Sequence, residues 1–182
     1  LDLADEKGLL IVDELYDKWG STQAWAGSAP WNDVWFDNMK EWIKRDRNHP
    51  SVIMWSFGNE LQFQQTRWNW PTGDWGQTTY RIMDVVAKRY DPTRKTTVAM
   101  YPARAKGIIK ADPAFKIKEN IIPPELATIT DVAAFNYVWD DYQEYLKHAP
   151  DMIIYQSEAV TNELAAPYFG MDRDKMVGLA YW

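Results

Sequence analysis

Two glutamates, Glu60 and Glu158, each follow a short apolar run at a point where a strand is expected to end. Carboxyl groups on two sides of a sugar can cleave a glycosidic bond. One donates a proton to the leaving oxygen, and the other attacks the anomeric carbon or activates water. A separation of about 5–5.5 Å predicts retention of configuration, and a wider gap predicts inversion. A lone glutamate near a strand end is usually a solvated charge, so the hypothesis needs a fold that brings both together.

Short apolar runs alternate with amphipathic segments along the whole chain, which predicts repeated strand and helix pairs. Strands are expected at 9–12, 52–55, 97–100, 132–135, 152–155 and 177–181. Helices are expected at 1–7, 31–47, 77–90 and 141–147, with a looser helical segment at 172–175. Such regular alternation favours a parallel sheet with helices outside it. The segment 101–124 is a long irregular connection, which is typical of a functional loop or an insertion.

A parallel sheet with outer helices is either an eight-stranded barrel or a doubly wound open sheet. The chain has no Gly-x-Gly-x-x-Gly run and no phosphate-binding loop, so the α/β (β/α)8 TIM barrel is favoured over a nucleotide-binding open sheet. Active-site groups of such barrels stand at the carboxyl ends of the strands. Three strands separate Glu60 from Glu158 in sequential order, and we therefore expect the two to face each other across the barrel mouth.

The composition argues against several classes of binding partner and cofactor. The chain has 182 residues, a formal net charge of −6, no Cys and two His. The negative charge argues against a nucleic-acid partner, and the absence of a long apolar run argues against a membrane span. Disulfides and thiolate metal sites are excluded, and His49 and His148 lie in no ligand spacing. We therefore expect no metal and no cofactor, and His49 is expected to be structural.

Aromatic residues are unusually frequent, with 11 Trp, 10 Tyr and 6 Phe. Flat, partly wet rings are suited to stacking on sugar rings, whereas rings that fill loops would be buried. Composition favours neither interpretation over the other. The tryptophans expected in loops or at helix starts are Trp25, Trp31, Trp35, Trp68, Trp70, Trp75 and Trp139.

Four stretches of the sequence resemble glycoside hydrolase family 2, which includes β-galactosidases, β-glucuronidases and β-mannosidases. The longest is 45–60, RDRNHPSVIMWSFGNE, which closely resembles the acid/base signature of the family. The others resemble the third strand (5–14, DEKGLLIVDE), the nucleophile strand (153–159, IIYQSEA) and the eighth strand (178–182, GLAYW). The resemblance covers nearly the whole chain in the expected order.

The resemblance implies a retaining mechanism, with Glu60 as acid/base and Glu158 as nucleophile. It also implies that Asn59 holds the 2-hydroxyl of the substrate and that Tyr137 orients Glu158 by a hydrogen bond. Trp182 and Trp139 would form the floor or wall of the pocket. Glu14 would line the site or pair with a basic group on a strand outside this sequence.

Residues 1–182 are expected to form one partial barrel domain, from about strand 3 to strand 8. A complete barrel needs about 250 residues, so N-terminal strands and flanking β-sandwich domains are expected to be absent from this sequence. The first functional hypothesis is a retaining exo-β-glycosidase that acts on terminal β-D-glycosides, with β-galactosidase as the first choice. The alternatives are β-glucuronidase, β-mannosidase, a carbohydrate-binding barrel without activity and an inactive structural fragment. A homo-oligomeric parent protein is compatible with these features, and the compartment stays open.

Overall fold

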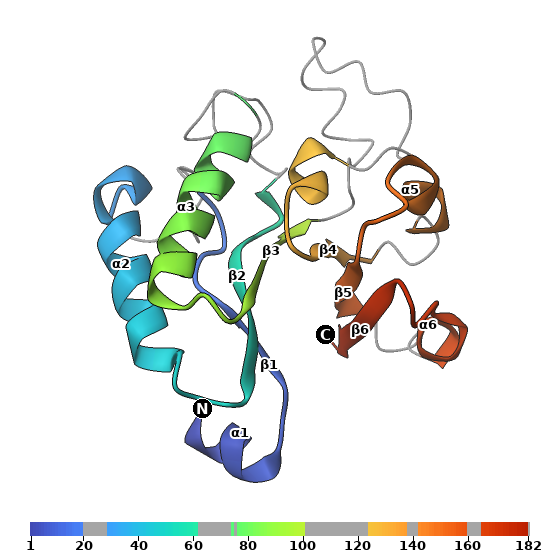
Figure 1. Ribbon diagram of the computed structural model, residues 1–182, viewed down its shortest axis with the longest axis horizontal. Coiled ribbons are helices and arrows are strands. Elements are labelled where there is room, and N and C mark those ends of the chain that lie inside the picture. The colour runs from blue at the N-terminus through green and yellow to red at the C-terminus, as the bar shows by residue number, and fades with distance from the viewer. Residues whose placement is uncertain are drawn as a thin grey trace.

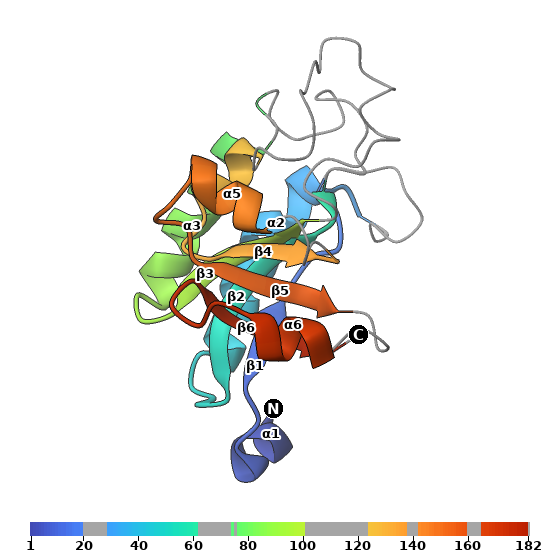
Figure 2. The same ribbon diagram turned by 90° about the vertical axis from the view of Figure 1, so that its right-hand side faces the viewer.

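A computed structural model describes residues 1–19, 29–61, 74, 76–100, 124–137, 142–159 and 165–181. Six parallel strands form one sheet in chain order: β1 (Ile11–Glu14), β2 (Val52–Asn59), β3 (Lys95–Met100), β4 (Ala133–Asn136), β5 (Ile154–Ala159) and β6 (Met176–Tyr181). The sheet curls into a half-barrel (Figures 1 and 2), which agrees with the expected partial (β/α)8 barrel.

Helices accompany the strands. Four of them were predicted from the sequence: α1 (Asp2–Lys7), α2 (Trp31–Asp46), α3 (Gln77–Tyr90) and α5 (Tyr142–His148). The 3-10 helix η3 (Glu125–Thr128) and α6 (Ala165–Gly170) were not. Helices α2 and α3 lie side by side outside β1, β2 and β3 (Figure 1). Aromatic pairs join helix to strand, with ring centroids 4.8–5.6 Å apart: Trp42 with Trp55, Tyr80 with Phe57, and Tyr145 with Phe135. No described helix is long and apolar enough to cross a membrane.

The pleat of the strands separates this apolar layer from the inner face of the curl, which carries both polar and apolar side chains. On β2, Trp55 and Phe57 are fully buried against the helices, whereas Ser56 points to the inside of the curl. Successive side chains of a strand lie on opposite faces. One strand therefore contributes side chains both to the core under the helices and to the inside of the curl. The aromatic core therefore fixes the outer face while the inner face keeps side chains that can meet a polar ligand.

Several boundaries differ from the sequence-based expectation. Strands β2 and β5 continue to Asn59 and Ala159, so Asn59 and Glu158 lie within strands rather than after them. Two further differences have a local cause. Strand β1 begins at Ile11 rather than at residue 9, because Gly8 adopts a left-handed conformation (φ 68°) and Leu9 closes the end of α1 by donating to the carbonyl of Ala4 (3.0 Å). The expected helix at 172–175 is a turn. There the Asp172 side chain accepts the amide of Asp174 (3.0 Å), as in an Asx turn, and the final helix lies earlier in the chain, at α6.

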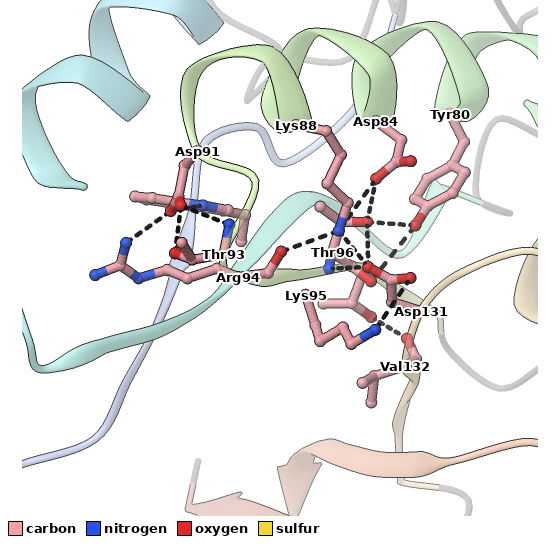
Figure 3. A network of polar contacts seen from close by, with 12 residues as sticks. Tyr80, Asp84, Lys88, Asp91, Thr93, Arg94, Lys95, Thr96, Asp131 and Val132 are labelled. Atoms are coloured by element: carbon pink, nitrogen blue, oxygen red, sulfur yellow. Dashed lines mark hydrogen bonds and ion pairs between the residues drawn. The ribbon is translucent and has the colours of Figure 1, made fainter.

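An aspartate and an arginine tie the turn after α3 to the loop before β2. Figure 3 shows the contacts of Asp91 with Thr93 and Arg94. Asp91 accepts hydrogen bonds from Trp55 (3.0 Å), Arg94 (2.6 Å) and the amide of Thr93 (3.0 Å). Arg94 also donates to the carbonyls of Arg47 and His49, both at 2.8 Å. This cluster fixes the ends of α2, α3 and β3 opposite the mouth of the half-barrel.

Asp91 should stabilise the fold at neutral pH. Burial alone raises its pKa, but the hydrogen bonds from Thr93, Arg94 and Trp55 outweigh that effect and lower the pKa to about 2, against 3.8 for a free side chain. A carboxylate whose pKa is lower in the folded state contributes stability above the unfolded value and loses it as the pH falls through the folded value. We expect Asp91→Asn to reduce the free energy of unfolding by about 2 kcal/mol at pH 7.

Urea denaturation between pH 7 and pH 2 measures this difference. The wild type and Asp91→Asn should converge as the pH falls from about 4 to about 2. The matched control, Asp151→Asn, removes an exposed carboxylate and should change the stability little. An equal loss of stability in both variants, or a difference that persists unchanged below pH 2, would contradict the role of Asp91.

Candidate active site

The inner face of the curled sheet encloses a hollow of about 670 Å³. Small side chains line much of it: Ser56, Thr97, Ala99, Ala134, Ser157, Gly178 and Ala180. Its only described charged lining residues are Glu14 and Glu158. Small inward side chains leave room for a ligand where larger ones would fill the curl, so the hollow presents two carboxyl groups to whatever enters it.

The strands depart from regular register at the end where the polar residues stand. The pairing shifts between Ser56 and Asn59 in β2, and again between Phe135 and Asn136 in β4. Such irregularities turn side chains away from the positions that the regular pleat would give them. Here they bring polar residues of β2 and β4 together at the mouth of the hollow.

Glu60 and Tyr137 have left-handed backbones, with φ of 48° and 57°, and among the described residues they are the two non-glycine positions with positive φ. The Glu60 amide donates to the carbonyl of Ala99 (2.8 Å), and the Tyr137 amide donates to the carbonyl of Glu158 (3.0 Å). This conformation is costly for residues with a Cβ and persists where the surroundings impose it. It occurs here just after the ends of β2 and β4, which are separated in the sheet by β3, and such conformations are often found at functional sites.

Asn136 links Glu60 to the strand that carries Glu158 through hydrogen bonds. It is fully buried at the end of β4. Its Nδ2 donates to Asn59 Oδ1 (3.0 Å) and to Glu60 Oε1 (3.2 Å), and its Oδ1 accepts from the Ser157 hydroxyl (2.6 Å). Because Ser157 is the neighbour of Glu158 in β5, one carboxamide connects the strand ends that carry both acids.

Glu158 lines the hollow and accepts a short hydrogen bond from the Tyr137 hydroxyl. The backbones of the two residues are also joined, through the Tyr137 amide. The phenol therefore holds one carboxyl oxygen of Glu158, which is the contact that the family resemblance implies. The charge of Glu158 also acts on Glu60 and on Glu14, so the three acidic groups share one electrostatic environment.

The surroundings of Glu60 raise its pKa, mainly through burial, and the negative charges of Glu158 and Asp17 act in the same direction. The hydrogen bond from Asn136 and the positive charge of Lys18 oppose the effect. A carboxyl group with a raised pKa keeps its proton to higher pH, which suits a general acid. Glu60 therefore has the electrostatics of a proton donor beside a second carboxyl group.

Glu14 lines the hollow at the end of β1 and accepts a hydrogen bond from the Ser56 hydroxyl (2.7 Å). Burial raises its pKa to about 7, and the charges of Asp17 and Glu158 add to this, while Ser56 and Lys18 oppose it. The side chain is nonetheless open to the hollow, so water there weakens the effect. Of the two roles expected for Glu14, the geometry places it in the lining.

The structure describes only some of the expected aromatic residues. Trp139 and Trp182, expected to border the pocket, lie outside the described residues, as do Trp25, Trp68, Trp70 and Trp75. Trp31 is buried and stacks on Trp35, with ring centroids 5.5 Å apart and planes 11° from parallel. This pair is loop and helix packing rather than a sugar platform.

Four polar residues of the site were given no role by the sequence: Asn136, Ser157, Asp17 and Lys18. Asn136 and Ser157 adjoin Tyr137 and Glu158, so their place at a strand end was the available signal. Asp17 contacts Asn59 across 42 positions of the chain. No local pattern indicates such a contact, because it depends on how the chain leaves β1.

One group of possible metal ligands lies among the described residues, at the other end of the sheet. Ligand atoms of Asp2, Asp5 and His49 lie within 4.8 Å of one another. His49 Nδ1 is 2.6 Å from Asp5 Oδ2, and the Ser51 amide donates to Asp5 Oδ1 (2.9 Å). These contacts fasten α1 to the loop before β2, which is the structural role expected for His49.

Comparison with known proteins adds a family to this geometry. The model of the family "Glycosyl hydrolases family 2, TIM barrel domain" matches residues 1–148. "Beta-galactosidase BoGH2A" of Bacteroides ovatus is 42% identical over 62 residues, which are 34% of this chain and 7% of that protein. A "Beta-glucuronidase" of Paenibacillus borealis is 31% identical over 114 residues, 56% of this chain and 17% of that protein.

A solved structure of a glycosyl hydrolase family 2 member from Bacteroides cellulosilyticus DSM 14838 superposes on the whole chain, with a TM-score of 0.71 and 25% identity. The chain spans 21% of the length of that protein. The family match covers most of the chain, and the solved relative has the same curled sheet. The chain therefore belongs to glycosyl hydrolase family 2 and is part of that family's TIM barrel domain.

Proposed function

We propose that the protein hydrolyses terminal β-D-glycosides with retention of configuration, using Glu60 as acid/base and Glu158 as nucleophile. The observation that carries the proposal is the bridge made by Asn136, which bonds to Glu60 and to the neighbour of Glu158. The ends of the strands that carry the two acids are thus tied together, Glu158 lines the hollow, and the charge of Glu158 acts on Glu60. The restriction to a terminal sugar and the assignment of retention come from the family resemblance.

In the first step, Glu158 attacks the anomeric carbon while Glu60 gives its proton to the departing glycosidic oxygen. The bond from the anomeric carbon to that oxygen breaks, and a glycosyl ester forms on Glu158. The raised pKa of Glu60 supplies the proton at a pH where a free glutamate has lost it. The hydrogen bond from Tyr137 holds the attacking carboxylate in place.

In the second step, Glu60, now ionised, takes a proton from water as the water oxygen attacks the anomeric carbon. The ester bond breaks, the free sugar leaves, and Glu60 is protonated again. Asn59 would bind the 2-hydroxyl of the sugar, a contact that strengthens at the transition state. The charge balances over the two steps.

Within this class, β-galactosides are the proposed substrates. The described lining of the hollow carries two carboxyl groups and no basic side chain. Such a lining repels the carboxylate of a glucuronide and tolerates a neutral hexoside. One relative named above is a β-galactosidase and the other a β-glucuronidase, so the comparisons leave both substrates open. Residues 1–182 are proposed to be one part of a longer catalytic protein, and the experiments therefore use the full-length protein.

The first prediction concerns the two glutamates. On aryl β-galactosides, we expect Glu158→Gly to lower turnover by about 10³-fold or more, and Glu60→Ala to lower it by about 10²–10⁴-fold. The loss in Glu60→Ala should shrink for leaving groups that need no proton. Azide should restore turnover in both variants, with an α-glycosyl azide from Glu158→Gly and a β-glycosyl azide from Glu60→Ala.

The control is Glu41→Ala, which removes an exposed carboxylate of α2 and should keep wild-type turnover. Aryl β-glucuronides and β-mannosides, tested in parallel, decide the sugar. Wild-type rates in Glu158→Gly would end the nucleophile assignment. Binding of glycans by calorimetry without product release from the wild type would point to a binding barrel instead.

The second prediction concerns Tyr137. Tyr137→Phe removes the hydroxyl that holds Glu158 and leaves the ring, so kcat should fall by about 10–100-fold with little change in stability. Tyr155→Phe is the matched control, because Tyr155 also lines the hollow and has no described hydrogen bond to Glu158. Steady-state kinetics of both variants make the comparison. Equal losses in the two variants would show that the Tyr137 contact does not position the nucleophile.

A further inference from the structure

Two charged residues beyond the end of β1 lie against the acid/base strand. The carbonyl of Asp17 accepts the amide of Asn59 (2.8 Å), and Asp17 Oδ1 accepts from Asn59 Nδ2 (3.2 Å). Asp17 therefore holds both the backbone and the side chain of the residue that precedes Glu60. The contact is not part of the sheet ladder, because the pairing partner of Asn59 in β3 is Ala99.

These contacts fix the orientation of the Asn59 carboxamide. An ionised carboxylate can only accept hydrogen bonds, so the NH₂ group of Asn59 must face Asp17. The other end of the amide, Oδ1, accepts from Asn136 Nδ2 at 3.0 Å. A flipped amide would lose both contacts, and its Nδ2 would face the donor of Asn136. Asp17 and Asn136 thus fix the orientation of the Asn59 carboxamide, and Asn59 lines the hollow.

Lys18 places a buried positive charge at the same position. It is 4% exposed, and its Nζ lies 2.8 Å from Asp17 Oδ1. A buried ammonium is costly unless nearby negative charge compensates it. Asp17 is one partner, and the charge of Lys18 also acts on Glu60 and Glu14. The structure thus keeps this cation beside Asp17, where its charge acts on Glu60 and Glu14.

The charged groups that act on Glu60 come from two described elements. Lys18 and Asp17 follow β1, and Glu158 belongs to β5, while the contact from β4 is the neutral Asn136. Glu158 and Asp17 raise the pKa of Glu60, and Lys18 lowers it. Lys18 is thus the described cation that offsets the two negative charges.

We propose that Asp17 and Lys18 form a positioning pair for the acid/base: Asp17 orients Asn59, and the charge of Lys18 balances the negative charges around Glu60. Neither residue touches the reacting atoms. The catalytic part of this inference rests on the proposed function. The effect of the two residues on the titration midpoint of Glu60 can be measured without a substrate.

Two variants that change the charge in opposite directions distinguish this electrostatic role from a purely structural one. Lys18→Met removes the positive charge and keeps an apolar stem of similar length, so the titration midpoint of Glu60 should move to higher pH. Asp17→Asn removes a negative charge, so the midpoint should move to lower pH. If Asp17 and Lys18 mattered only for packing, the two variants would not shift the titration midpoint of Glu60 in opposite directions.

The measurement is ¹³C NMR of the full-length protein with labelled glutamate carboxyl carbons, with the Glu60 resonance assigned by its loss in Glu60→Gln. Lys18→Arg, which keeps the charge, should restore the wild-type midpoint. Unchanged midpoints in both variants, or shifts of the same sign, would overturn the proposal. If Lys18→Met does not fold, the other two variants still test the proposal: the midpoint should fall in Asp17→Asn and stay unchanged in Lys18→Arg. An unchanged or higher midpoint in Asp17→Asn would then overturn it.

A kinetic readout links the pair to turnover. In a protein that cleaves aryl β-glycosides, the basic limb of the pH profile of kcat/KM should move upward in Lys18→Met and return in Lys18→Arg. A limb that stays in place while the NMR midpoint moves would overturn the catalytic part of the inference. A wild-type protein that cleaves no glycoside would end the proposed function and leave the NMR comparison to decide the charge balance.

Discussion

The buried carboxamide of Asn136 is the contact on which the site depends. It has donors for β2 and an acceptor for β5, and it uses both, so the loop that carries Glu60 and the strand that carries Glu158 are held in one arrangement. A buried amide without such partners would be destabilising, because its polar groups would have lost water without replacement. The same hydrogen bonds therefore satisfy the core and align the two acids.

Local structure around this contact departs from regular strand geometry, and further register shifts occur near the starts of β1 and β5. Register shifts occur at the ends of β2, β4 and β5, and left-handed backbones occur at Glu60 and Tyr137. At the other end, Asp91 and Arg94 make a dense and conventional hydrogen-bond cluster. The residues with left-handed backbones thus stand at the end of the sheet that carries the candidate acids. Costly backbone conformations are expected at functional sites, where they persist because the surrounding structure imposes them.

The alternation of apolar and amphipathic segments predicted the parallel sheet and the helices outside it. The sequence also predicted that Glu60 and Glu158 follow strands, where barrel chemistry is found. In the structure Glu60 directly follows β2, whereas Glu158 lies within β5. The sequence could not predict the role of Asn136, since the bridge depends on a register shift that no local pattern encodes. The contact of Asp17 with Asn59 was likewise out of reach, because it joins residues 42 positions apart. The spacing of apolar residues along the sequence predicts which face of a helix or strand a residue lies on. The contacts of Asn136 and Asp17 depend instead on how distant segments of the chain pack together.

The central claim is that Glu158 forms a covalent bond to the sugar while Glu60 handles the proton. Trapping measures this directly: a 2-deoxy-2-fluoro-β-galactoside with a good leaving group slows both steps, and hydrolysis of the ester slows enough for the intermediate to accumulate. Mass spectrometry of the digested full-length protein should then find one fluorosugar on the peptide that contains Glu158. A sugar attached to a different residue, or turnover of the parent galactoside with no trapped ester, would contradict the account.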